Sequence, residues 1–305
     1  MAGSAEKGPK VIYGTRAPLG SGGSENPALA PSLCWGGMNL YDPRAGYNQT
    51  KMGAIGLGGG ESAAINQVPS AISAVNIAAS QTPGSAALTL VSTTGAGITV
   101  LSTATTVWSS GNVIPVGTLA IDGLPGLVSF GLASVSNGYT YISMYDPTKA
   151  IARNVRITSG GNDSGITFTV AGYDLYGYPQ TEAITGANAG VASGKKAFKF
   201  VSSITPSGAV ASTASAGTGD VYGFPLLSSF WGDTDIVWNN AWITANTGYL
   251  AADTTSPATS TTGDVRGTYA VQSASDGTKR LMVFVAPSIN NLALGNAGLF
   301  GQTPA

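Results

Sequence analysis

The stretch GITFTVAGYDLYGYPQTEAITG, residues 165–186, decides the fold, because two half-apolar runs meet there at a corner rich in tyrosine and glycine. In the first run Ile166, Phe168 and Val170 alternate with hydroxyl or small side chains. A period of two predicts a strand with one buried face and one half-polar face. Gly177 supplies a flexible point in the corner, and the run QTEAIT then returns. The stretch therefore predicts a β-hairpin.

Similar short runs recur from about residue 85 onward, among them LTLVST, GITVLST, LVSFGLA, YTYISMYD and RNVRITSG. Gly, Pro, Asn and Asp separate them, and TTGAGIT and SNGYT contain residues that accept the positive φ of tight turns. Many short strands bounded by turn residues are typical of a sandwich or barrel. We predict an all-β fold with an antiparallel β-sandwich, jelly-roll-like core and meander or Greek-key connections.

We expect three parts in the chain. Residues 1–62 lack helical and strand periodicity but contain aromatic residues, which predicts an extended Gly/Pro-rich N-terminal arm that orders against another surface. Residues 63–286 form the β core, with room for two subdomains that meet near 120–150. Residues 287–305 form a short C-terminal tail.

Two segments of the core allow more detailed predictions. Residues 63–80 fit a short helix or a strand pair, because Pro69 interrupts any long helix. The Asp-Gly pair of ASDGTK, which lies between two apolar runs, predicts a second hairpin over residues 267–288.

Charged residues are scarce, at 10% of the chain against about 25% in an average soluble domain. The net charge is −1 and no block of like charge occurs, so the sequence lacks the basic stripe that a nucleic-acid partner requires. A surface with so few charges disfavours a freely soluble monomer. It fits a protein that is largely covered by copies of itself or by a partner.

The chain has no histidine, which removes the usual general base and the commonest metal ligand. Its single cysteine, Cys34, excludes an internal disulfide and is expected to be a small buried hydrophobe. No apolar run is long enough to span a membrane, and the first twenty residues lack the apolar segment of a signal peptide. We therefore predict a non-enzymatic protein without cofactor, metal or membrane partner.

The stretch GVASGKKAF, residues 190–198, departs from a phosphate-binding loop, because Lys196 stands where Ser or Thr should follow Lys195. We interpret it as a solvated strand edge that lysines protect from pairing.

Asp233 and Asp235 lie two residues apart, on one face if this segment is a strand. A pair of carboxylates would suit a glycan hydrolase, and polar positions near a turn are the simpler interpretation. Asp146, Asp163 and Asp174 lie beside turn residues and are expected to close turns by hydrogen bonding.

Several aromatic residues gather in one region of the sequence. They are Phe224, Phe230, Trp231, Trp238 and Trp242. Aromatic rings can stack on sugar rings, which would make the region a glycan-binding platform. Aromatic residues are also enriched in sandwich cores and subunit interfaces, and we favour that interpretation.

Three stretches of sequence follow one another between about residues 150 and 226. They are ARNVRITSGGNDSGITFTVAGYDLYGYPQTEAITG, GKKAFKFVSSITPSG and VYGFPL. With TGDVRGTYAVQSASDGTKRLMVFV at 262–285, they resemble segments of structural proteins of tailed bacteriophages. The resemblance covers about a third of the chain and does not extend to residues 1–120. It implies a virion head or head-decoration (cement) protein of the β-sandwich type.

That resemblance and the composition together lead us to expect a decoration protein on the capsid surface, assembled in the host cytoplasm. Its expected partners are the major capsid protein and copies of itself, with a trimer preferred because threefold sites are common in shells. A tail or spike protein that binds host glycans is the alternative. The candidate interface residues are Tyr13, Trp35, Tyr41, Tyr47, Tyr173, Tyr176, Tyr178, Trp231, Trp238 and Trp242.

Overall fold

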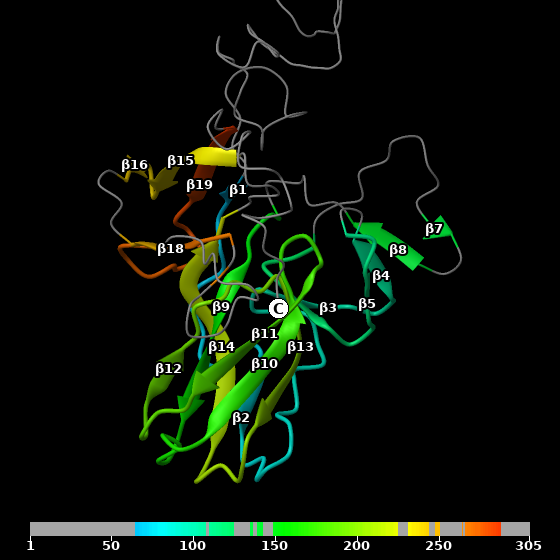
Figure 1. Cartoon of the computed structure of the whole chain (residues 1–305), viewed down its shortest axis with the longest axis vertical. Coiled ribbons are helices and arrows are strands. Elements are labelled where there is room, and N and C mark those ends of the chain that lie inside the picture. Colours follow the sequence, from blue (N-terminus) through cyan, green and yellow to red (C-terminus); the bar gives the residue numbers. More distant parts are fainter. Residues whose placement is uncertain are drawn as a thin grey trace, which may run out of the picture. The chain divides into compact units, whose positions relative to one another are not determined.

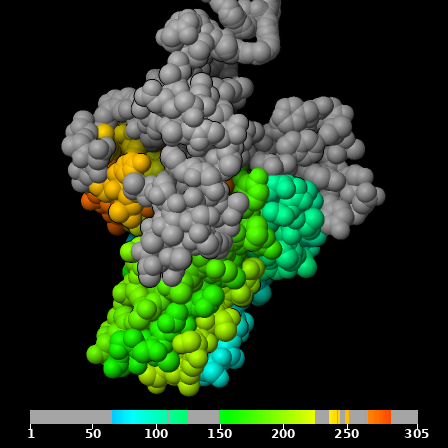
Figure 2. All heavy atoms as spheres, in the orientation of Figure 1, coloured from blue at the N-terminus to red at the C-terminus, as the bar shows by residue number. Residues whose placement is uncertain are grey.

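The computed structural model describes residues 65–107, 110–124, 135–136, 139–142, 149–224, 231–243, 248–250, 264 and 266–287. In Figures 1 and 2 the coloured parts of the chain belong to these residues, and the remainder of the chain is grey. The described residues form strands and turns and no helix, which confirms the all-β prediction. Accordingly, none of them belongs to a helix that could span a membrane. The predicted N-terminal arm lies outside the described residues, as does the predicted tail apart from Pro287.

The chain divides into two compact units. The described residues of the larger unit fall within Ile65–Ser229 and Ile236–Met282, which is most of the predicted core. Those of the smaller unit fall within Phe230–Asp235 and Val283–Gly295.

One sheet of the larger unit contains the predicted hairpin. Its strand order is β11-β10-β13-β6-β3, and neighbouring strands run antiparallel. Phe168 lies opposite Ile184 and Tyr173 opposite Pro179, so the hairpin prediction is confirmed. The five strands are β3 (Ile98–Val100), β6 (Leu119–Ile121), β10 (Thr167–Tyr173), β11 (Pro179–Thr185) and β13 (Phe200–Pro206) (Figure 1).

A second sheet has six strands, in the order β12-β9-β14-β18-β17, with β2 also paired to β14. Strand β14 is the longest and pairs antiparallel with β9, β18 and β2 along its length. The strands are β2 (Ala78–Gln81), β9 (Arg153–Ser159), β12 (Val191–Ser193), β14 (Ala214–Gly223), β17 (Tyr249–Leu250) and β18 (Thr268–Ala270).

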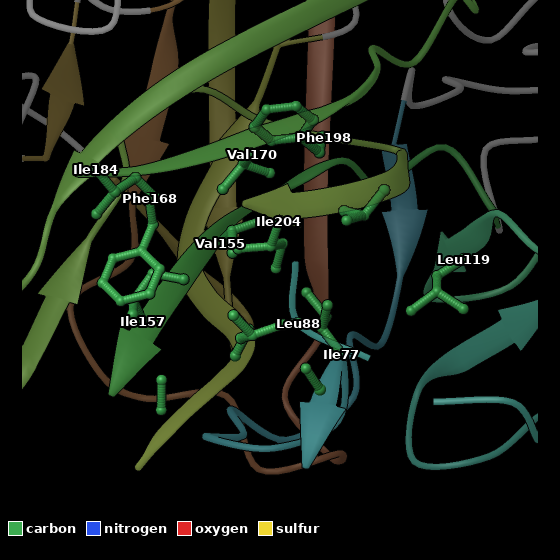
Figure 3. Packing of buried hydrophobic residues seen from close by; sticks show 14 of the residues in the cluster. Ile77, Leu88, Leu119, Val155, Ile157, Phe168, Val170, Ile184, Phe198 and Ile204 are labelled. Carbon is green, nitrogen blue, oxygen red and sulfur yellow. The ribbon is translucent and has the colours of Figure 1, made fainter. Parts of the chain in front are cut away.

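The two sheets share one apolar core, as in a β-sandwich. Phe168 and Ile204 come from the five-stranded sheet, and Val155 and Ile157 come from the six-stranded sheet; all four side chains are fully buried in the same cluster. Figure 3 shows these side chains filling the space between the strands. Phe168 and Val170 of β10 contribute to this core, as a period of two predicts, and so does Ile184 of β11.

Two smaller sheets complete the described strands. One has the order β5-β4-β8-β7 and the other β1-β19-β15-β16. The first contains β4 (Thr105–Val107), β5 (Val113–Ile114), β7 (Val135–Ser136) and β8 (Tyr139–Ile142). The second contains β1 (Ile65–Gln67), β15 (Trp231–Trp238), β16 (Ala241–Trp242) and β19 (Leu281–Pro287).

Three local predictions need correction. Strands β4 and β8 are parallel, so the strand pairing is not wholly antiparallel. Residues 63–80 contain two strands, β1 and β2, but these lie in different sheets and do not form a pair. The predicted hairpin over 267–288 is wrong, because β18 and β19 also belong to different sheets.

The turn inside the predicted 267–288 hairpin does exist. Oδ1 of Asp276 accepts hydrogen bonds from the backbone N–H groups of Thr278 and Lys279, and Gly277 has φ 84°. A tight Asp-Gly turn therefore forms as its sequence dictates, but a turn does not determine which strand its flanks will join.

Gly172 shows how closely the strands of the five-stranded sheet approach each other. The register of β10 against β13 shifts between Ala171 and Gly172, as at a β-bulge. A Cβ atom on Gly172 would lie 2.0 Å from the backbone oxygen of Phe200. Only glycine fits this approach.

Candidate functional site

Most charged side chains whose burial is described are buried. The buried charged residues are Asp122, Arg153, Asp163, Asp174, Glu182, Lys196, Lys199, Asp264 and Arg266. Among charged residues whose burial is described, only Lys195, Asp276 and Arg280 are exposed, and the remaining ones are partly buried. Buried charges are rare in proteins unless they are paired or hydrogen-bonded, so their partners define the candidate site.

Arg153, on β9, is the centre of the first cluster, and its side chain is fully buried. Its guanidinium donates hydrogen bonds to partners on four other chain segments. The acceptors are Gly219 O (2.7 Å), Ser70 O (2.9 Å), Ser275 Oγ (3.0 Å), Asp122 Oδ2 (3.1 Å) and Asp220 Oδ1 (3.1 Å). We call Arg153, Ser70, Asp122, Asp220 and Ser275 the Arg153 cluster. The planar fork of an arginine suits such a multiple junction better than a lysine would.

Tyr222 completes the surroundings of Arg153. The guanidinium carbon lies 5.2 Å from the centre of the Tyr222 ring, and the Tyr222 hydroxyl donates to Asp220 Oδ1 at 3.0 Å. Burial raises the pKa of the Tyr222 hydroxyl well above its ordinary value. The hydroxyl therefore stays protonated and acts as a donor within the cluster.

A second ion pair joins Arg266 to Asp174. Oδ1 of Asp174 also accepts from the backbone N–H groups of Tyr176 (2.8 Å) and Tyr178 (2.9 Å), which confirms the turn-closing role predicted for Asp174. Oδ1 of Asp163 accepts from the distant N–H of Ala211 instead, and Asp146 lies outside the described residues. The guanidinium of Arg266 lies over the ring of Tyr176 at 4.2 Å. The corner of the hairpin is therefore fastened from inside by an arginine that follows it by about 90 residues.

The third group of buried charges surrounds residues Gly194–Lys199, which we call the crossover because it leads from β12 in one sheet to β13 in the other. Oε2 and Oε1 of Glu182 accept from the backbone N–H groups of Lys195 (2.5 Å) and Lys196 (2.8 Å). Oδ2 of Asp264 accepts from the N–H of Ala197 at 3.0 Å. Two carboxylates from other segments thus hold three consecutive amides.

The side chains of the crossover lysines correct one prediction. Lys195 is exposed, as expected for a strand edge, but Lys196 and Lys199 are buried. The ammonium group of Lys199 donates to the backbone oxygens of Ile121 and Lys149, both at 2.7 Å. The solvated-edge interpretation is therefore wrong for Lys196, because the Glu182 carboxylate beside it offsets the loss of water.

The three predicted tyrosines of the hairpin corner differ in exposure. Tyr176 is buried, and its ring is occupied by Arg266, so it presents no surface to a partner. Tyr173 and Tyr178 are half-buried. Tyr173 packs against the small core cluster that contains Phe200.

Two members of the predicted aromatic region have described side chains, and both are buried. Trp238 donates from Nε1 to Ser273 Oγ at 3.0 Å and lies 6.3 Å from the ring of Tyr222. Phe224 lies 5.5 Å from Tyr249. Their burial favours the core interpretation over a sugar platform at these two positions, because a stacking ring must be accessible to the ligand.

The other predicted site residues lie beyond the described side chains. Asp233 and Asp235 both fall on β15, two residues apart, and the same strand contains Trp231. Trp242 falls on β16. The side chains of these four, and residues Tyr13, Trp35, Tyr41 and Tyr47, are not described. Within the described part, no three His, Cys, Asp or Glu side chains gather as metal ligands would.

The sequence analysis missed the Arg153 cluster altogether. Its members are spread from residue 70 to residue 275, and each has an ordinary local context. One signal was available, since Arg153 lies two and four residues before Val155 and Ile157 and so shares the face of the strand that these apolar residues occupy. An arginine at a core-facing strand position calls for buried acceptors.

Comparison with protein families, curated proteins and solved structures found no significant match to the chain. These comparisons therefore assign the chain to no family, and a phage origin stays a proposal.

Proposed function

We propose that this chain is a non-enzymatic decoration (cement) protein of a tailed-bacteriophage capsid, which binds the major capsid protein and stabilises the head shell. The observation that carries the proposal is the inward orientation of its charges. Residues 65–121 contain no charged residue, and most charged side chains described elsewhere are buried. The surface that remains is made largely of small, uncharged side chains.

The outer face of the hairpin sheet illustrates this surface. Thr181, Ala183 and Thr185 of β11 are exposed on it, and Thr169 of β10 lies between Ala183 and Thr205 of the flanking strands. The green and yellow-green surface in Figure 2 belongs to residues from about 150 to 224, which include these strands. Covering hydroxyl and methyl groups costs less desolvation free energy than covering charges. Such a face suits extensive contact with protein.

The interior also supports a structural role. The Arg153 cluster and the Arg266–Asp174 pair join distant chain segments by charge-assisted hydrogen bonds, which are stronger than neutral ones. A cross-linked body of this kind suits a protein that must keep its shape under the internal pressure of packaged DNA.

The resemblance of residues 150–226 to phage structural proteins gives the proposal its setting. Under it the protein is located on the capsid surface after assembly in the host cytoplasm. Its partners are the major capsid protein and two further copies of itself, and it needs neither cofactor nor nucleic acid.

The decisive experiment is the copy number of the chain in purified virions, measured by quantitative mass spectrometry against the major shell protein. A ratio near one, or a simple fraction of it, is expected for a lattice component. A few copies per particle would place it in the tail and favour the glycan-binding alternative. Absence from particles would overturn the structural role.

A deletion tests the proposed contribution of the N-terminal segment. Removing residues 1–60 leaves every described strand intact, so the β core should fold. We expect the truncated protein to lose attachment to capsids, measured by co-sedimentation, while its circular dichroism keeps the β signature. Full attachment of the truncated protein would contradict the proposed role of the arm.

A further inference from the structure

Strand β11 lies at one edge of the five-stranded sheet, and it is longer than the strands at the other sheet edges (Figure 1). It has seven residues, Pro179–Thr185. The strands at the other ends of the described sheets have two or three residues each. They are β1, β3, β5, β7, β12, β16 and β17. A long edge strand presents a row of unpaired N–H and C=O groups to other strands, and natural proteins usually keep such edges short or charged.

The hydrogen bonds at the two ends of the hairpin show which residues of β11 bond to β10. The N–H of Gly186 donates to Ile166 O, and the N–H of Asp174 donates to Tyr178 O. Hydrogen-bonded and non-hydrogen-bonded pairs alternate along an antiparallel ladder. Because both bonds join even-numbered residues that lie opposite each other in the register, the even-numbered residues of β11 are the ones that bond to β10.

The odd-numbered residues Thr181, Ala183 and Thr185 therefore form the free edge. Their N–H and C=O groups point away from β10, and no described strand pairs with them. Their side chains are exposed and uncharged. Pro179, which could block pairing, stands only at the start of the strand. The edge thus has no protection along most of its length.

The charges nearest this edge do not block it. Glu182, the only charged residue of β11, is buried, and its carboxylate accepts from the backbone N–H groups of Lys195 and Lys196 inside the protein. The side chain of Lys195 is exposed, and its long flexible stem allows the ammonium group to stay in water.

The exposed side chains of β11 follow a pattern that is the same in both directions about Ala183. Thr181 lies two residues before it, and Thr185 lies two residues after it. Antiparallel pairing of two β11 strands about a twofold axis at Ala183 would place Thr181 of each copy opposite Thr185 of the other. Threonine pairs of this kind stabilise a sheet, and each opposed pair of free-edge residues would exchange two hydrogen bonds. The edge is therefore complementary to itself.

We propose that β11 is a self-association edge, through which two copies of the chain pair antiparallel about a twofold axis at Ala183 and join their five-stranded sheets into one continuous sheet. The contact uses the same surface on both copies, so it closes as a pair and does not extend into a filament. The inference does not rest on the proposed function. A twofold contact can coexist with a threefold contact elsewhere on the surface, as in assemblies of dihedral symmetry.

Residue-resolved amide hydrogen exchange in the full chain, measured over a series of protein concentrations, tests the pairing. The amides of Thr181, Ala183 and Thr185 should exchange more than about tenfold more slowly in the dimer than in the monomer. Their protection should follow the dimer fraction measured by analytical ultracentrifugation. The amides of Glu182 and Ile184 should be protected at every concentration, because they bond to β10.

Two results of this exchange experiment would overturn the proposal. Fast exchange of the three odd-numbered amides at every concentration would show that no strand pairs with the edge in the purified chain. Protection of the same amides in a monomer, independent of concentration, would assign the edge to another segment of the same chain.

Strand β12 provides an internal control. The N–H of Gly194 donates to Val155 O, so in the register of β12 against β9 the N–H groups of Val191 and Ser193 point away from β9. No described strand pairs with them on that side. These amides should exchange fast at every concentration. If they slow on dimer formation as much as those of β11, the contact is not specific to β11 and the proposal is refuted.

A matched pair of proline variants completes the design. Ala183→Pro removes an N–H that points to the free edge, so it should leave the hairpin folded but remove the central hydrogen bonds of the dimer. We expect its dimer dissociation constant to rise at least about tenfold, whereas Ser193→Pro, which removes an outward N–H from β12, should leave it unchanged. An equally tight dimer in Ala183→Pro, or an equal weakening in Ser193→Pro, would contradict the proposal. If Ala183→Pro fails to fold, the exchange of the wild-type chain decides.

Discussion

The side chains in the middle of the sandwich and the side chain of Arg153 are all fully buried, yet the two regions are held together in different ways. The middle is a continuous apolar cluster in which Phe168, Val170 and Ile204 meet Val155 and Ile157. Its stability comes from many small contributions, none of which requires a particular partner. In the Arg153 cluster each polar atom needs a specific acceptor or donor, and every partner comes from a different part of the chain.

The contrast shows how differently the two regions should tolerate change. Removing a methyl group from an apolar core leaves a small gap whose cost is graded. Removing one partner of a buried ion pair leaves an uncompensated charge without water. Mutations in the two regions therefore measure two separate sources of stability.

The largest effect on stability is expected for Arg153→Met, because this variant leaves the carboxylates of Asp122 and Asp220 without the guanidinium that pairs with them. We expect a loss of about 3–5 kcal/mol in the free energy of unfolding, measured by urea denaturation. Arg153→Lys keeps the charge but not the fork, so it should lie between Met and wild type. A Met variant as stable as wild type would show that the cluster contributes no stability.

The next effect concerns pH. Because the folded-state pKa of Glu182 is raised from 4.5 to about 7, its stabilising contribution is complete below pH 4.5 and is lost as the pH rises toward 7. The loss should reach at most about 3 kcal/mol, read from urea midpoints across this range. Glu182→Gln should remove this slope, whereas Ile204→Val should retain it. An unchanged slope in Glu182→Gln would assign the pH dependence to other groups.

A smaller effect is expected in the apolar middle. Ile204→Val removes one methyl group from a fully buried side chain and should cost about 0.5–1.5 kcal/mol, independent of pH. Thermal and urea unfolding would both report it. A cost as large as that of Arg153→Met would remove the distinction between the two regions.

The smallest effect is expected on the outer face of the hairpin sheet. Thr169 is exposed between Ala183 and Thr205, so Thr169→Val should change stability by no more than about 0.5 kcal/mol. A larger loss in urea unfolding would show that the hydroxyl takes part in the fold of the isolated chain.

The features that could be predicted from the sequence are those that depend on residues close together in the chain. Alternation in β10 predicted its buried face, since a period of two is a local property, and the turn residues that follow predicted the hairpin. The turn at Asp276 and the turn-closing role of Asp174 were also predicted, because an aspartate beside turn residues hydrogen-bonds to nearby amides.

What could not be predicted depends on contacts between distant residues. Nothing near Arg153 indicates that its acceptors include Asp122 and Ser275, and nothing near Lys196 indicates that the crossover turns inward. The failed hairpin over 267–288 has the same cause. Its turn is local, but Ser275 beside that turn is bound to Asp220, and strand partners are chosen over the whole chain.

The long reach of Arg153 also has a consequence for synthesis on the ribosome. Arg153 is made early, together with Asp122, but its acceptors Asp220 and Ser275 emerge much later. Strand β2 likewise cannot pair with β14 until Ala214 and Ala216 have been synthesised. The nascent chain must therefore keep an arginine and the edges of its early strands hydrated until residue 275 has left the exit tunnel. Only then can the Arg153 cluster gain its last partner.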